Sequence, residues 1–106
     1  MKKAELKDVL QSEKGRIEMV VKIMDNSFDS HAFILKLLEK FPSVYGQLLI
    51  KHNNVTTAHA EISNFLRNNA TDLHIKEEER KSESMDIFGI VNPCAQWQKT
   101  DYVKPY

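Results

Sequence analysis

The chain has 106 residues, of which 42% are hydrophobic and 28% charged, and its 15 basic and 15 acidic side chains give a formal net charge of zero. That length allows one domain, and that composition is typical of a folded chain rather than a disordered one. Its apolar runs are too short for a membrane span, no apolar segment follows the N-terminal lysines, and Cys94 is the single cysteine. We therefore expect a cytoplasmic protein without a membrane segment, a secretory signal or an internal disulfide.

Apolar residues at helical spacing occur on both sides of the polar stretch QSEKG near the N-terminus. This spacing predicts two helices, at about 3–11 and 13–25, with Ser12 as the N-cap of the second. One continuous bent helix is the alternative.

The stretch NSFDSHAFILKLLEKFP carries the strongest helical signal. Asp29 is suited to cap this helix, and Phe28 is placed to pack on Phe33 as in a hydrophobic staple. Pro42 ends the helix, because the residue before a proline avoids helical geometry. Ser43 is then expected to cap the next helix, which the asparagines of HNN terminate.

The stretch VTTAHAEISNFLRNN, residues 55–69, follows that turn. Its apolar residues fall on one helical face, which must be buried: Ala58, Ile62, Phe65 and Leu66. Together with the preceding helix it forms a helix-turn-helix-like pair at 44–69, although Ile62 comes two positions later than that motif requires.

The polar face of this helix offers side chains of the types that contact DNA: Thr57, His59, Asn64, Arg67 and Asn68. Proteins that neutralise many phosphates usually carry a basic excess, and this chain carries none. DNA binding is therefore the alternative interpretation, and a core helix with a polar outer face is the first.

Residues 76–86, KEEERKSESMD, contain one apolar side chain. We expect a polar connector there, with a helix extension or a pair of wing-like strands as the alternatives. Asn92 followed by Pro93 is typical of a helix start, which predicts a short helix over 93–100 that carries Trp97.

Aromatic residues gather at the C-terminus, where residues 101–106 are expected to form a tail. Trp97, Tyr102 and Tyr106 are of the types that protein interfaces favour, so they are candidate partner-binding residues. Burial of Trp97 in the core is an equally weighted alternative.

No pattern for a metal, a cofactor or catalysis is present. The histidines at 31, 52, 59 and 74 lack the close spacing of zinc ligands, and Cys94 is distant from all of them. The letters DSH at 29–31 are those of a hydrolase triad, but neighbouring helical residues point about 100° apart. We therefore expect no enzyme, and no catalytic, metal-binding or cofactor-binding residue.

The strings SFDSHAFI, FPSVYGQLL, HAEISNFL, SMDIFG and CAQWQK, within about residues 26–99, resemble small uncharacterised bacterial proteins of prophage and mobile-element type. The resemblance implies a small cytoplasmic bacterial accessory protein. It implies no activity and transfers no functional residue.

These observations together predict an all-α fold, with one helical domain at 1–100 built of five to six short helices. We expect it to act without catalysis, through protein–protein contact or self-association. The alternative is a DNA-binding accessory or regulatory protein of a mobile element.

Overall fold

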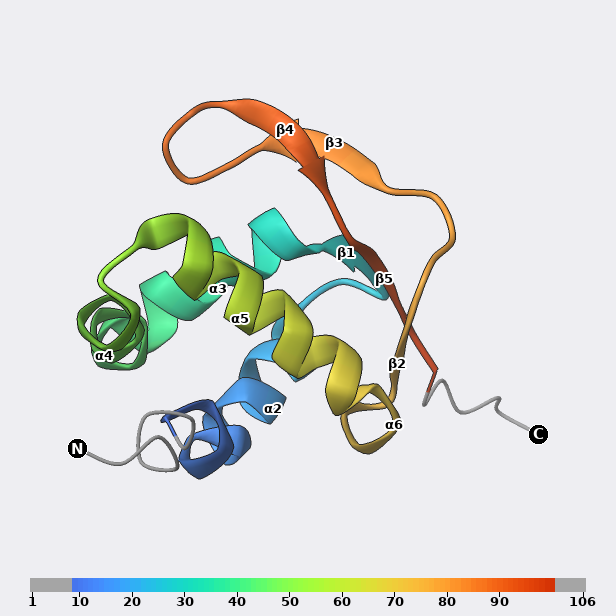
Figure 1. The fold of residues 1–106 in the computed structure, drawn as a ribbon. Helices are drawn as coiled ribbons and strands as arrows, with labels where there is room; N and C mark the ends of the chain where they lie inside the picture. The colour runs from blue at the N-terminus through green and yellow to red at the C-terminus, as the bar shows by residue number, and fades with distance from the viewer. Residues whose placement is uncertain (1–8, 101–106) are drawn as a thin grey trace.

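The computed structural model describes residues 9–100, which form a mixed α/β fold (Figure 1). The helices are α2 (Lys14–Ile23), α3 (Ser30–Lys40), α4 (Pro42–His52), α5 (Val55–Asn68) and α6 (Ala70–Leu73). The strands are β1 (Ser27–Asp29), β2 (Ile75–Glu77), β3 (Ser82–Met85), β4 (Val91–Cys94) and β5 (Gln96–Lys99). The prediction of an all-α, wholly helical protein is therefore wrong.

The strands form two antiparallel sheets. A three-stranded sheet has the order β1-β5-β2, and β3 pairs with β4 in a two-stranded hairpin. The chain runs from β2 into β3 and returns from β4 into β5, so the hairpin continues the sheet upward and over the helices (Figure 1). Trp97 on β5 stands opposite Phe28 on β1 and Glu77 on β2.

The predicted helix over 93–100 is wrong, because this segment supplies β4 and β5. Asn92 and Pro93 carry the local chemistry of a helix start, yet both lie inside β4. Backbone pairing with the neighbouring β3, and with β1 and β2 farther away in the sequence, outweighs that local preference. Within 76–86, the wing-like strands are the alternative that the structure adopts, in place of the polar connector.

Two predicted helix caps are also wrong. The N-cap positions of α2 and α4 are Glu13 and Phe41, and neither makes a side-chain capping bond. Pro42 occupies the first turn of α4, where its missing N–H is tolerated, and this starts the helix one residue before Ser43. Residues 9–12 are helical, and the start of the predicted 3–11 helix lies outside the described residues.

The local signals around α3 and α5 are confirmed. Asp29 accepts a hydrogen bond from the Ala32 N–H at 2.8 Å, and Phe28 stacks on Phe33 with ring centroids 6.3 Å apart. Asn53 ends α4 in the left-handed conformation, with φ of 51°. Asn54 caps α5 by accepting from the Thr57 N–H.

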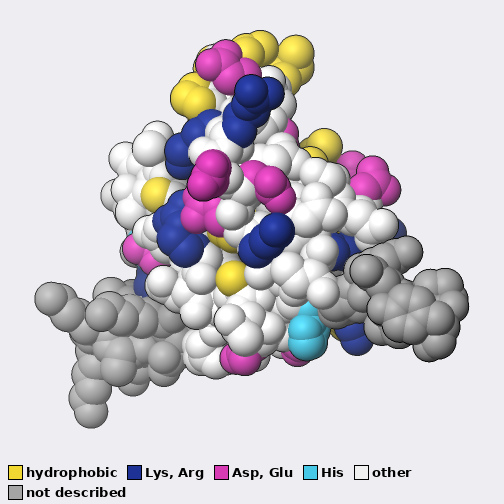
Figure 2. Space-filling view, turned by 90° about the vertical axis from the view of Figure 1, so that its right-hand side faces the viewer, with side chains coloured by type: hydrophobic (Ala, Val, Ile, Leu, Met, Phe, Trp, Pro, Cys, Tyr) yellow, Lys and Arg dark blue, Asp and Glu magenta, His cyan; other side chains and the backbone are white. Residues whose placement is uncertain are grey.

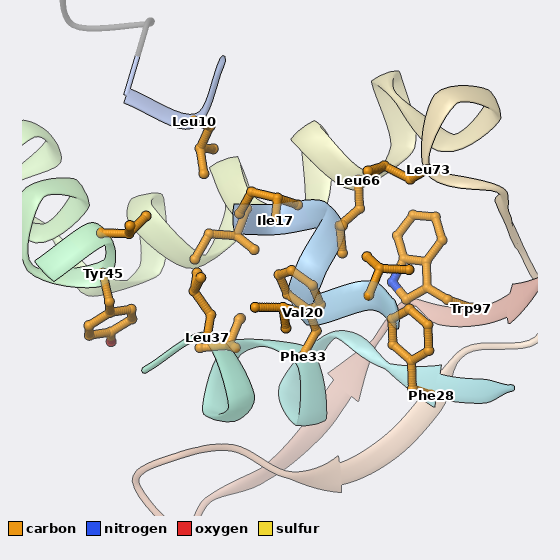
Figure 3. Packing of buried hydrophobic residues seen from close by; sticks show 14 of the residues in the cluster. Leu10, Ile17, Val20, Phe28, Phe33, Leu37, Tyr45, Leu66, Leu73 and Trp97 are labelled. Carbon is orange, nitrogen blue, oxygen red and sulfur yellow. The ribbon is translucent and has the colours of Figure 1, made fainter. Parts of the chain in front are cut away.

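The core lies between α2, α3, α5 and the three-stranded sheet. Phe33, Val20 and Leu66 are fully buried, and the Trp97 ring approaches them from β5 (Figure 3). The face predicted for α5 is confirmed, with Ala58, Ile62 and Leu66 buried and Phe65 half-buried. No helix within residues 9–100 has the length and apolar content to cross a membrane.

Candidate functional site: the hairpin and the groove beside it

The β3–β4 hairpin has its polar side chains toward the helices and its apolar side chains toward solvent. Four small or polar residues on it are half-buried: Ser82, Ser84, Asn92 and Cys94. The alternate positions are exposed: Glu83, Met85, Val91 and Pro93. Side chains on successive strand residues point to opposite faces, so this alternation defines a polar inner face and a largely apolar outer face.

A histidine on α3 fastens the inner face to the helices. His31 is 9% exposed, and its ring nitrogens lie 2.8 Å from Ser84 Oγ and 3.1 Å from Asn92 Oδ1. Because Asn92 Oδ1 can only accept, the His31 Nε2–H donates to it, and in the neutral ring Nδ1 then accepts from the Ser84 hydroxyl. Ser84 and Asn92 are cross-strand partners, so one imidazole holds both strands.

Asp29, the cap of α3, provides a second attachment. Its Oδ2 accepts from the Ser82 hydroxyl at 2.8 Å. Burial acts to raise the pKa of Asp29, but hydrogen bonds from the Ala32 N–H and from the Ser82 hydroxyl outweigh it and hold that pKa below its ordinary value. The carboxylate therefore stays ionised while it joins the hairpin to the helix.

The loop between the strands is ordered by its own contacts. Asp86 Oδ1 accepts from the backbone N–H groups of Phe88 and Ile90, at 2.9 and 3.0 Å. The Ile90 hydrogen bond is the main reason that the pKa of Asp86 lies below its ordinary value. Gly89 has a φ of 83°, a conformation that a side chain would strain.

Phe88, at the tip of this loop, packs over α5. Its ring stacks on His59, with centroids 6.1 Å apart and an interplanar angle of 10°. The His59 ring is held in place by a 2.7 Å hydrogen bond between its Nε2 and the Tyr45 hydroxyl. Burial lowers the pKa of His59, so the ring is neutral at neutral pH.

A groove of about 760 Å³ lies between the hairpin, α5 and the start of α3. Among the five DNA-contact candidates, His59, Asn64 and Arg67 line it, and Thr57 and Asn68 do not. As predicted, Asn64, Arg67 and Asn68 are exposed.

Arg67 is nevertheless engaged within the chain. Its guanidinium donates two hydrogen bonds to the Glu77 carboxylate, at 2.7 and 2.9 Å, and a third to Asn64 Oδ1. The bond from Arg67 also lowers the pKa of Glu77. The positive charge on this face of α5 is therefore neutralised internally.

The aromatic candidates fall in different places. Trp97 has no exposed surface, and its Nε1–H donates to the buried Ser30 hydroxyl at 2.9 Å. This burial leaves Trp97 no surface to offer a partner. Tyr102 and Tyr106, in the predicted tail, lie outside the described residues.

Three hydrogen-bonded side chains are arranged like a nucleophile, a base and the group that orients the base: Ser84, His31 and Asn92. However, Asp29 and Asp86 border the hollow that Ser84 lines, and their charges oppose the oxyanion of acyl transfer. We therefore assign this trio to holding the hairpin. Across residues 9–100, no cluster of three or more histidine, cysteine or acidic side chains is arranged to hold a metal ion.

The exposed apolar side chains of the hairpin were missed from the sequence. Met85 and Val91 on the outer face, and Phe88 and Ile90 at the loop beside the groove, are 57–62% exposed, and these four residues are called the hairpin patch. Figure 2 shows hydrophobic side chains at the top of the molecule, where the hairpin lies, and mixed acidic and basic side chains below them. A short loop that contains Gly89, between two alternating runs, was a usable hairpin signal.

Comparison of the chain with protein-family models, curated proteins and solved structures gives no match.

Proposed function

We propose that this protein acts by binding another protein through the hairpin patch. The observation that supports this is the orientation of the hairpin. A hairpin packed on a helical body would bury most by turning its apolar side chains inward, whereas this one directs Ser84 and Asn92 to His31 and leaves Met85 and Val91 in water. Exposed apolar side chains gathered on one element in this way are typical of interaction sites.

The attachments of the hairpin suit such a role. His31 and Asp29 hold its strands, Asp86 orders its loop, and Phe88 rests on His59. A surface that is ordered before binding loses less conformational entropy when a partner docks. Phe88 is 57% exposed despite its stacking on His59, so its remaining surface is available to a partner.

Site-specific photo-crosslinking in cells of the organism that encodes the chain tests this function. A photoreactive phenylalanine analogue at Phe88 should give a discrete crosslinked protein, and Val91→Lys should abolish that product. The matched control places the analogue at Ile50, which is 83% exposed on α4 and is not part of the hairpin patch. The hairpin patch loses its support as the binding surface if the analogue gives the same crosslinked product at Phe88 and at Ile50. It also loses that support if Val91→Lys does not change the product formed at Phe88.

DNA binding through α5 is the second candidate. It is favoured by the turn at Asn53 and Asn54 between α4 and α5, and by a wing-like hairpin beside α5. It is opposed by the Arg67–Glu77 pair and by residues 76–86, in which acidic side chains outnumber basic ones.

Fluorescence anisotropy with mixed duplexes at two salt concentrations separates these two functions. We expect an affinity no tighter than about 10⁻⁴ M, the weak end of nonspecific binding. Tight, salt-sensitive binding that Arg67→Ala weakens would reverse the ranking.

A further inference from the structure

The outer edge of β3 is open to backbone pairing. The Asp86 N–H donates to the Ile90 carbonyl at 2.9 Å, which makes these two residues a hydrogen-bonded pair at the end of the hairpin. Since such pairs alternate in an antiparallel ladder, Ser82 and Ser84 bond toward β4, and Glu83 turns its N–H and carbonyl to the other side. Among the described strands, β3 pairs with β4 alone.

The edge of β4 differs from that of β3. Pro93 stands opposite Glu83, at a position where the backbone nitrogen points away from β3. Proline has no N–H, so the outer edge of β4 lacks a donor at its centre. Residues 81–86, KSESMD, contain neither proline nor glycine, so β3 is the edge on which another strand can pair.

We infer that two copies of this chain join through β3, antiparallel, about a two-fold axis at Ser82. With β3 continued by the one residue that precedes it, this register places Lys81 of each copy opposite Glu83 of the other, on the same face and in hydrogen-bonded pairs. An axis at Glu83 would place two glutamates opposite each other, and an axis at Ser84 would place Glu83 opposite Met85. Opposite charges across a strand pair stabilise it and like charges destabilise it, so charge selects the first register.

The two side chains are available for this pairing. Both Lys81 and Glu83 are exposed, and within residues 9–100 neither takes part in an ion pair. Lys81 lies near enough to Glu77 to help lower the pKa of that carboxyl, but Arg67 is the main cause of the shift. The inference rests on the proposed function, because the resulting four-stranded sheet would offer both hairpin patches to one partner.

Light scattering and sedimentation at several concentrations test the dimer. We expect wild type to have the mass of two chains, and we expect Lys81→Glu and Glu83→Lys each to raise the dissociation constant at least about tenfold. Both variants should keep the wild-type circular dichroism, since both positions are exposed. Mixing the two variants should restore a dimer, because every 81–83 pair in the mixed species again joins opposite charges.

A wild-type chain that stays monomeric through the micromolar range overturns the inference, and so does a dimer that neither charge reversal weakens. If both charge-reversal variants lose the dimer and mixing them does not restore it, the register with its axis at Ser82 is rejected. Val91→Lys separates the two proposals, because it lies on β4 and should leave the dimer intact while it removes crosslinking at Phe88. If the wild-type chain is a monomer but still crosslinks to another protein through Phe88, the dimer is rejected and the proposed function is not.

Discussion

Removing the His31 imidazole tests whether the hairpin is held as the structure indicates. His31→Ala deletes two hydrogen bonds, at 2.8 and 3.1 Å, that join α3 to both strands. A side-chain hydrogen bond contributes about 0.5–1.5 kcal/mol net, so the two together amount to about 2 kcal/mol. Ser84 and Asn92 are half-buried, so water can reach them in the variant and the loss should not greatly exceed that figure. A loss of about 2 kcal/mol lowers the melting temperature of a domain of this size by about 10 °C.

A double-mutant cycle isolates the contact from the loss of the ring itself. Urea denaturation, followed by the helical circular dichroism signal, gives the free energy of unfolding of His31→Ala, of Ser84→Ala and of the double variant. We expect a coupling energy of about 1 kcal/mol between these two positions. A control cycle with the exposed Ser43 should give a coupling near zero, because Ser43 makes no hydrogen bond to His31. Coupling below about 0.3 kcal/mol for His31 and Ser84 would refute the attachment and leave the hairpin free to move.

Three further predictions follow from other contacts. Phe33→Ala should lower the free energy of unfolding by about 3–5 kcal/mol, because the ring is fully buried; a loss below about 1 kcal/mol contradicts this. Arg67→Ala should raise the pKa of Glu77 toward its ordinary value in a carboxyl NMR titration, and an unchanged pKa would mean that the pair is open in solution. Because the pKa of Glu77 is depressed in the folded state, this pair stabilises the fold above the unfolded pKa, and the stabilisation is lost as pH falls through the folded one. Phe88→Ala should raise the pKa of His59, because burial is the main cause of its depression, and no change would place Phe88 away from the ring.

Two of these predictions have a matched control in the chain. Met19→Ala removes a side chain that is 57% exposed on α2 and should change stability by less than about 0.5 kcal/mol. For the Arg67 prediction, Lys36→Ala is the control, because Lys36 pairs with Glu39 on α3 and its removal should leave the pKa of Glu77 unchanged.

The helices around the site were predictable because their determinants are local. The Asp29 cap, the Phe28–Phe33 contact and the left-handed Asn53 each involve residues close together in the chain. Helical hydrogen bonds also join near neighbours, so spacing and capping residues suffice to place such elements. The exposure of Asn64 and Arg67 followed from the same periodicity, because one face of α5 had to be buried.

The three-stranded sheet could not be placed in this way, because its strands pair with partners distant in sequence. Residues 92–99 hold a credible helix start, and only pairing with β3 on one side and with β1 and β2 on the other turns them into β4 and β5, with Trp97 at the centre of the three-stranded sheet. The site depends on tertiary structure for the same reason. A local pattern shows that Ser84 and Met85 lie on opposite faces of a strand, but it does not show which face meets the helices. His31, 53 positions before Ser84, decides this by hydrogen bonding to the polar face, and the apolar face is left to solvent.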